Sequence, residues 1–568
     1  MSATRSRIRL DGEGATLAVL LVFVAAVSAL PVGRLILEAF APGGRFDLSV
    51  IASVLSAGST WTAAWHSLVT AGFGTAISLV LGTLFALLVA LTDMRGKAAL
   101  VFCFLLPLMI PPQVTALSWA QLFGPASPLL ITLGLAPPLG SPNPIYSREG
   151  IILLLGIQQA PLVFLTVRAG LRSLPREMIE AARSCGARRL SVLFTIVLPM
   201  MTPPLVAGAA LAYVSSVGNF GIPALLGIPA GYTVLPTLIY ERLASFGPSI
   251  ISDVAVLSIL VGVLAVLGFA VQSLITGRRD YRTVGAPSQA LSYPLGRARP
   301  LVEAGAWAII VLILVVPLLA LVATSLVSAY GVALSEKTVT LSNYAEVLFR
   351  QDATVRAFRN SFFLACGASA LLMIIAVPFA AFVVWRPNRL LRGLAALAEV
   401  PYALPGIVLG IAAILIFIRP LPVFGISLYN TIWIIFFAYL ARFLTLSLRP
   451  VVGAVQQTDR ALEEAARMTG ASYLFRLRTI LFPLLAPAAA AGAILTFMTS
   501  FNELTVSALL WSAGNETLGV VVFNLDDGGY TVLASAVAAV TVAVIVAIMG
   551  VTALFARLLP RGVLPWTN

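Results

Sequence analysis

Long apolar stretches follow one another along the whole chain, separated by short polar or charged segments. A helix that crosses a membrane needs about 20 predominantly apolar residues, and twelve stretches meet this length. They fall into two sets of six. We therefore predict twelve spanning helices, near residues 15–37, 65–92, 98–124, 150–169, 199–227, 251–276, 301–328, 359–385, 393–418, 428–448, 484–511 and 533–558.

Composition supports a lipid environment. Of the 568 residues, 60% are hydrophobic and only 10% are charged, whereas soluble domains average about 25% charged residues. This excludes a soluble enzyme, a nucleic-acid-binding protein and a disordered scaffold. The fold class predicted is an all-α polytopic membrane protein with the lipid bilayer as its surroundings. The net charge of +13 is then a property of basic loops and indicates no nucleic-acid partner.

Basic residues set the predicted orientation. Most of the 36 lysines and arginines fall in alternate loops, and such loops face the cytoplasm. Arg5, Arg7 and Arg9 precede the first stretch, which is too long for the roughly 7–15-residue core of a cleaved signal peptide. Arg442 and Arg449 are counted with one of these inside loops. Both termini are therefore expected in the cytoplasm.

An internal repeat divides the chain. EAARSCGARRLSVLFTIVLP at 180–199 and EAARMTGASYLFRLRTILFP at 464–483 agree at 11 of 20 positions with an offset of 284. Earlier in the chain the offset becomes 294, which aligns Pro107 with Pro401 and Pro111 with Pro405. We predict a six-helix domain over 1–276, a linker over 277–300 and a second six-helix domain over 301–568. Because six is even, the domains keep one orientation and are related by a pseudo-twofold axis along the membrane normal.

The best-matched segments lie in loops, at about 170–199 and 450–483. Acidic residues early in each segment and a glycine at its end favour a short helix stopped by a left-handed cap. The adjacent small residues allow another backbone to approach. Each loop therefore presents a short docking helix, whose central residues are Glu180, Ala181, Ala182, Gly186, Glu464, Ala465, Ala466 and Gly470. A second short helix is expected to run to Pro199 or Pro483, where the next span begins.

The spacing E-A-A-x₃-G-x₉-I-x-L-P resembles the loop signature of permease subunits of binding-protein-dependent ABC importers. The first copy matches throughout, and the second departs only at Phe482, which replaces the leucine. The resemblance implies two tandem permease domains in a bacterial inner (cytoplasmic) membrane. It also implies that both loops are coupling helices seated on two copies of a separate ATPase subunit, which binds ATP and magnesium. A periplasmic or extracellular substrate-binding protein is the other implied partner.

Catalytic chemistry is not expected of this chain. It has no G-x₄-G-K-[ST] phosphate loop, and neither the three cysteines nor His66 has the spacing of a metal site or a catalytic triad. We therefore predict that it is not an enzyme, holds no metal and binds no cofactor, and that a partner hydrolyses ATP.

Broken or polar positions within the spans are the candidates for a substrate pathway. Glu503 is a carboxylate in an apolar run, and it is either a gating or cation-contacting residue or a helix-end carboxylate near the interface. The other pathway candidates are Asn219, Asn502, Ser216, Ser500 and Gln113, and the predicted helix breaks are at Pro107, Pro111, Pro401 and Pro405.

A fused double permease with Asn219-Phe220-Gly221 and Glu503-Leu504-Thr505 after the signatures resembles iron(III) importer permeases. Iron(III) is the expected substrate, and thiamine, phosphonate or polyamine are alternatives within the same importer class. A proton-coupled secondary transporter shares the topology, but it needs several embedded ionisable residues and gives the two signatures no purpose.

Overall fold

The computed structural model describes residues 12–172, 174, 176–245, 249–276, 293–420, 425–501 and 503–554. In these ranges, ten helices are long and apolar enough to cross a membrane, and two bent helix pairs raise the number to twelve. The all-α polytopic fold predicted from the apolar stretches is thus confirmed. Most of the predicted linker, 277–292, lies outside the described residues.

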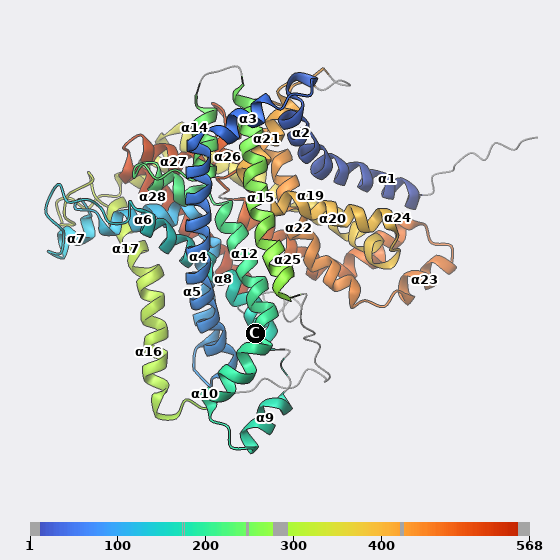
Figure 1. The fold of residues 1–568 in the computed structure, drawn as a ribbon, viewed down its shortest axis with the longest axis horizontal. Helices are drawn as coiled ribbons and strands as arrows, with labels where there is room; N and C mark the ends of the chain where they lie inside the picture. Colours follow the sequence, from blue (N-terminus) through green and yellow to red (C-terminus); the bar gives the residue numbers. More distant parts are fainter. Residues whose placement is uncertain are drawn as a thin grey trace, which may run out of the picture.

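The first half is built from helices of very different lengths (Figure 1). Its main elements are α1 (Gly12–Val24), α2 (Leu30–Phe40), α3 (Ser49–Ser56), α4 (Gly58–Leu91), α5 (Lys97–Met109), α6 (Pro112–Phe123), α7 (Pro128–Thr132), α8 (Arg148–Leu171), α9 (Arg176–Ser184), α10 (Arg189–Val192), α11 (Leu198–Met200), α12 (Thr202–Val217), α13 (Gly221–Gly227), α14 (Leu235–Leu243) and α15 (Ile250–Thr276).

The second half repeats this order. Its main elements are α16 (Arg299–Ile310), α17 (Val316–Ser325), α18 (Ser342–Ala345), α19 (Asp352–Trp385), α20 (Arg389–Ala403), α21 (Gly406–Phe417), α22 (Ile432–Gln456), α23 (Ala461–Met468), α24 (Tyr473–Arg476), α25 (Phe482–Ser500), α26 (Ser507–Leu510), α27 (Leu518–Asp527) and α28 (Thr531–Leu554).

Equivalent helices coincide at the offsets of the sequence repeat. α4 and α19 are each 34 residues long, and their first residues, Gly58 and Asp352, are aligned by the repeat. α6 and α21 are each 12 residues long and begin at aligned positions too. The same is true of the first residues of α8 and α22, Arg148 and Ile432, at the offset of the signature segments. The duplication inferred from sequence is therefore a duplication of structure.

In the described ranges, a π-helical turn precedes a proline at four places. The turns are Ala25–Ala29, Leu193–Val197, Val311–Val315 and Leu477–Leu481, each ending two residues before a proline. A proline lacks the N–H of a helical hydrogen bond and its ring clashes with the carbonyl of residue i−4, and a wider turn relieves both problems. In the second copy the helix continues through Pro483 into one run, Tyr473–Ser500, whereas in the first copy it passes Pro199 and then bends by 58° between Met200 and Thr202. The predicted separate short helix ending there is wrong.

Several predicted boundaries also change. α4 and α19 begin seven residues before the apolar runs near 65 and 359. The predicted spans 199–227 and 484–511 are each interrupted, because α12 ends at Val217 and α25 ends at Ser500. In both cases a short helix, α13 or α26, follows the interruption.

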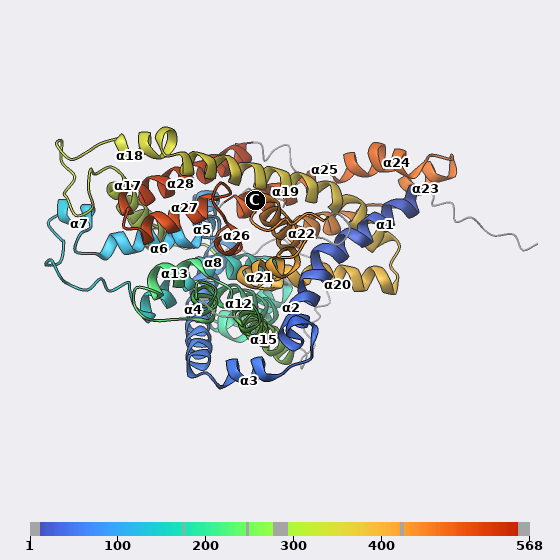
Figure 2. The same cartoon turned by 90° about the horizontal axis from the view of Figure 1, so that it is seen from above.

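The first helices of the two halves are exchanged. α1 contacts α19, α20 and α24, and α2 packs on α21 as well as on α15 of its own half. α16 contacts α5, and α17 packs on α6 as well as on α28. Both views show α1 beside α20, and α17 beside α6 (Figures 1 and 2). Leu20, Val24 and Val27 accordingly belong to the apolar core of the second half.

Candidate functional site

The two signature segments form short helices, α9 and α23, that stand at the edge of the helical body (Figure 1). Gly186 and Gly470 follow them with φ of +85° and +81°, a conformation that glycine adopts without steric cost. Glu180 and Ala181, like Glu464 and Ala465, are exposed, whereas Ala182 and Ala466 are half-buried. Met178 and Leu462 occupy equivalent positions and are also exposed. Each helix therefore has an exposed surface that is both apolar and acidic.

α23 is anchored by buried charges. Glu463 is 5% exposed, and its Oε1 lies 3.0 Å from Nε of Arg476. Nη2 of Arg476 lies 3.5 Å from Glu13 at the start of α1, and Glu13 also pairs with Arg386. Arg460 donates to the Trp385 carbonyl at 2.8 Å. Through this network α23 is tied to the exchanged first helix.

α9 is anchored by apolar contacts instead. Ile179 and Val192, which are equivalent to Glu463 and Arg476, are buried. Arg183 lies over the ring of Tyr293, 5.6 Å from its centroid. Tyr293 donates its N–H to the Leu91 carbonyl at 2.8 Å, so the end of the linker is attached to the same part of the first half.

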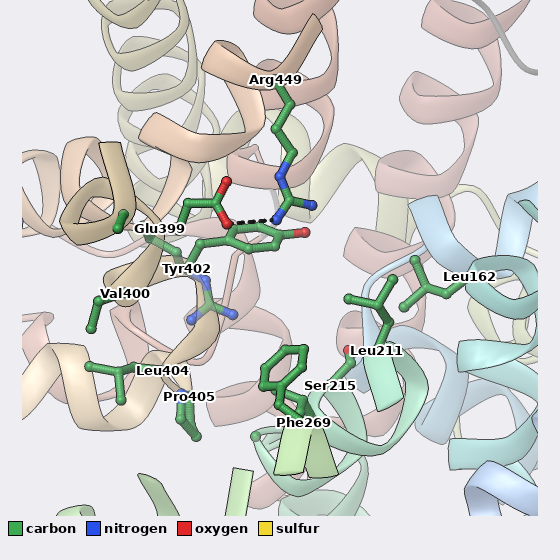
Figure 3. A pocket seen from close by; sticks show the side chains of 14 residues that line it. Leu162, Leu211, Ser215, Phe269, Glu399, Val400, Tyr402, Leu404, Pro405 and Arg449 are labelled. Carbon is green, nitrogen blue, oxygen red and sulfur yellow. Dashed lines mark hydrogen bonds and ion pairs between the residues drawn. The ribbon is translucent and has the colours of Figure 1, made fainter. Parts of the chain in front are cut away.

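A cavity of about 440 Å³ lies between the two halves. The first half contributes residues of α8, α12 and α15, and the second half contributes residues of α20 and α22 and the break before α21. Figure 3 shows Glu399, Tyr402 and Arg449 on one wall, with Leu162, Leu211 and Ser215 across from them. Gly218 lies directly against Pro405, since an added Cβ would be 3.1 Å from the Cβ of that proline.

The charged groups of this cavity come from the second half. Glu399 Oε2 and Arg449 Nη2 are 3.3 Å apart, and the guanidinium of Arg449 lies 5.8 Å from the ring centroid of Tyr402. Arg442 also lines the cavity. Arg442 and Arg449 were predicted in an inside loop, but both lie within α22. An arginine inside an apolar run could have indicated that Arg442 lies within a spanning helix. Counting it among the loop residues hid this indication.

Glu503 is a helix-capping residue in this structure. Its carboxylate accepts hydrogen bonds from the Val506 N–H at 2.9 Å and the Ser507 N–H at 3.3 Å, and from the Thr505 hydroxyl. Arg442 Nε lies 3.8 Å from Oε1. Glu503 is buried, and of these two charged residues only Arg442 is among the described residues that line the cavity.

Asn219 is the equivalent helix-capping residue of the first half. Its Oδ1 accepts the Ile222 N–H at 3.1 Å, which is the bond equivalent to that between Glu503 and Val506. Gln113 is fully buried at the start of α6 and packs against Gly221, whose added Cβ would lie 2.9 Å from the Gln113 nitrogen. The structure thus brings Gln113 and the start of α13 together.

The remaining candidates are less informative. Ser216 and Ser500 are buried, and Ser500 donates to the Phe497 carbonyl at 3.3 Å. Asn502 lies outside the described residues. The helix breaks predicted at Pro107 and Pro401 are wrong, because these prolines lie inside α5 and α20, whereas Pro111 and Pro405 stand at the breaks before α6 and α21. Among the described residues, no three His, Cys, Asp or Glu side chains are grouped to hold a metal ion.

The family of the chain follows from sequence comparison. Residues 78–246 and 372–563 each match the family described as binding-protein-dependent transport system inner membrane component. The two matches begin at equivalent positions of α4 and α19. The chain belongs to this family, with two copies of its domain in tandem.

Curated relatives cover different lengths of the chain. A probable ABC transporter permease protein of Sinorhizobium fredii is 28% identical over 76% of this chain and 75% of its own length. The ferric transport system permease protein FbpB of Actinobacillus pleuropneumoniae is 26% identical over 94% of this chain and 76% of its own. The molybdenum transport system permease protein ModB of Escherichia coli is 28% identical over 36% of this chain and 90% of its own.

Proposed function

We propose that this chain is the permease subunit of an ATP-driven importer for iron(III), and that α9 and α23 are its coupling helices. The observation that carries the proposal is the pair of protruding signature helices, each with an exposed glutamate, Glu180 or Glu464, at the same position. Such a surface serves one ATPase subunit per half. ATP hydrolysis belongs to these partners, and a substrate-binding protein delivers the cargo.

Iron(III) is supported by the length of the similarity. Relatives named as ferric permeases match this chain over 94% and 88% of its length, across both halves. The molybdenum permease matches 36% of it, which is the extent of one domain. Molybdate is therefore the second candidate cargo. Thiamine, phosphonate and polyamine stay as alternatives from the sequence.

The proposed orientation places α9, α23 and both termini in the cytoplasm. The basic residues near these helices support it, since positive charge is retained on the cytoplasmic side. The breaks at Pro111 and Pro405 then lie deeper in the membrane than the signature helices.

The decisive experiment is uptake by proteoliposomes that contain this chain, its ATPase and its binding protein. Radiolabelled ferric iron, molybdate and thiamine are compared with and without ATP. Glu180→Lys and Glu464→Lys are expected to lower ATP-driven uptake about tenfold or more, because reversing a charge at an interface costs several kcal/mol. Glu336→Lys, in an exposed loop before α18, is the matched control and is expected to leave uptake unchanged.

Each outcome has a clear meaning. ATP-dependent uptake of ferric iron that is lost on either reversal supports both the class and the cargo. ATP-dependent uptake of molybdate or thiamine alone replaces iron(III). Uptake that ignores ATP and survives both reversals overturns the importer and restores the proton-coupled transporter.

A further inference from the structure

Beside the cavity, the two halves differ in charge at two equivalent positions. Gln158 and Asn219 in the first half correspond, at the offset of 284, to Arg442 and Glu503 in the second. Asn219 and Glu503 cap equivalent short helices through equivalent bonds, to the Ile222 and Val506 N–H groups. Capping therefore needs an acceptor at this position and not a negative charge.

Gln158 braces the broken helix of the first half. Its Nε2 donates to the carbonyls of Pro107 and Ile110, the latter at 3.0 Å, and its Oε1 accepts the Thr115 hydroxyl at 3.1 Å. A neutral side chain thus satisfies two buried carbonyls at the end of α5. Arg442 stands at the equivalent position of the second half, and its charge is not needed for satisfying such carbonyls.

Arg442 keeps unused donor capacity. A guanidinium carries five N–H donors, and Nη1 of Arg442 is buried without a hydrogen-bond partner among the described residues. The Glu503 oxygens already accept the Thr505 hydroxyl and two backbone N–H groups, so the contact with Arg442 is a long one of 3.8 Å. Gly406 makes room for the guanidinium, since an added Cβ would lie 2.6 Å from Nη1.

The cavity beside Arg442 has a positive lining. Among its described lining residues, Arg442 and Arg449 face one carboxylate, Glu399, which is already paired with Arg449. The wall from the first half is apolar apart from Ser215. Its volume of about 440 Å³ falls in the usual range of small-molecule sites, about 300–1,000 Å³. A bare trivalent cation would be repelled by the two guanidinium groups in this cavity, whereas an anion would accept hydrogen bonds from their N–H groups.

We propose that the cavity between the halves binds an oxygen-rich anion, held by Arg442, while the cargo passes through the permease. The chemistry shared by the possible ligands is a carboxylate or oxyanion surface, as on a carboxylate chelate of iron(III) or on a tetrahedral metal oxyanion. Planar guanidinium groups recognise such oxygens in a bidentate manner. The proposal rests on the importer function and adds that the cargo crosses the membrane as an anion.

Equilibrium binding to the complete permease–ATPase complex in lipid nanodiscs tests the proposal. The probes are radiolabelled ferric citrate and molybdate, without binding protein or ATP, and uptake by proteoliposomes is measured in parallel. Arg442→Gln and Glu503→Asn each introduce the residue of the first half. Arg350→Gln, an exposed arginine beside α19, is the matched control.

The double variant separates a ligand site from a structural ion pair. We expect Arg442→Gln, alone or with Glu503→Asn, to weaken anion binding about tenfold or more, since a charged hydrogen bond is lost. Glu503→Asn alone is expected to retain or strengthen binding, because it removes the competing carboxylate. Arg350→Gln is expected to behave as the unmodified protein. Copurification of the ATPase with each variant checks folding, and the double variant carries a pair that the first half already accommodates.

Three results would overturn the inference. One is binding and uptake restored in the double variant although both single changes reduce them, which is the behaviour of a purely structural pair. The second is binding that ignores Arg442→Gln, and the third is binding of neither probe. If ATP-driven uptake persists in these cases, the importer function stands and only the anion site fails; absence of uptake in the unmodified complex overturns the importer itself. Binding of only one probe supports the site and identifies the source of the anion.

Discussion

At Gly82, the spanning helix α4 lies directly against α8. A Cβ at this position would be 2.6 Å from the Ala160 carbonyl oxygen and 2.7 Å from the Cβ of Val163. The equivalent residue of the second half is Ala376, which is itself buried. The approach of the two helices is therefore closer in the first half, and it depends on a missing side chain.

Gly82→Ala is expected to destabilise the protein by about 1–3 kcal/mol, because overpacking forces a shift of α4 or α8. Gly72→Ala on the same helix is the control, since no atom lies within 4 Å of its added Cβ, and alanine favours a helix over glycine. Melting temperatures of the detergent-purified variants test this. Equal melting temperatures for both variants would contradict the close approach.

Asp526 carries a pH dependence. It lies in the last turn of α27, which is not among the ten helices of the described residues that are long and apolar enough to cross a membrane. Burial raises the pKa of Asp526 to about 6, opposed by a hydrogen bond from Thr531 and assisted by the charge of Asp527. Because the folded-state pKa lies above the unfolded value, the protonated form is favoured by folding. The contribution of protonated Asp526 to the stability of the fold is fully present below about pH 4. It is lost as the pH rises through about 6.

Asp526→Asn removes this dependence. The variant is expected to be about 1–3 kcal/mol more stable than the unmodified protein at pH 7, and to differ little from it below pH 4, because there both carry a neutral side chain. Melting temperatures measured from pH 4 to 8 test the expectation. Parallel curves for the two proteins would show that Asp526 titrates normally in the fold.

The helices α9 and α23 are equivalent in sequence but are held by different forces. Ile179 and Val192 support α9 by apolar packing, whereas Glu463 and Arg476 support α23 by a buried ion pair at 3.0 Å. Removing one member of a buried pair leaves an uncompensated charge, at a cost of about 3–5 kcal/mol, while apolar replacement of both is often tolerated. The first half provides that replacement.

Arg476→Val alone is therefore expected to lower stability by about 3–5 kcal/mol. Glu463→Ile combined with Arg476→Val introduces the residues of the first half and is expected to recover most of the loss. Hydrogen exchange in α23 and the melting temperature are the measurements. A double variant no better than the single one would mean that α23 needs its charges, through the contact of Arg476 with Glu13.

Elements with their own sequence signal were predictable. The long apolar runs indicated the spanning helices, the internal repeat indicated the duplication, and Gly186 and Gly470 indicated where α9 and α23 end. The short helices α13 and α26 were missed because their apolar residues continue those of α12 and α25. Side chains that cap a new helix, Asn219 and Glu503, mark those interruptions only once the fold is known. The cavity was missed because it joins residues of both halves.

At the scale of the whole molecule, each exchanged first helix is held by an ion pair, and the two helices contribute residues of opposite charge to these pairs. Glu13 at the start of α1 is negative and pairs with Arg386, which follows α19. Arg299 at the start of α16 is positive and pairs with Asp93, which follows α4. A hydrogen bond from the Leu295 N–H, with the ion pair to Arg299 as a further cause, lowers the pKa of Asp93. If α1 docked at Asp93, or α16 at Arg386, two residues of like charge would meet.

Partly exposed ion pairs such as these contribute about 1 kcal/mol or less to stability, so their main effect is to discriminate between the two docking sites. Arg299→Glu places a carboxylate against Asp93 and is expected to lower the melting temperature, less so at high salt because the repulsion is screened. Asp93→Asn added to it keeps an acceptor for the Leu295 N–H and removes the repulsion, so stability should return. If Asp93→Asn failed to restore stability, the cause would be loss of the Arg299 contact and not repulsion between like charges. The charges of the two ion pairs would then not determine where each first helix docks. Recovery would mean that two nearly equivalent halves use two opposite charges to direct each first helix to its own place.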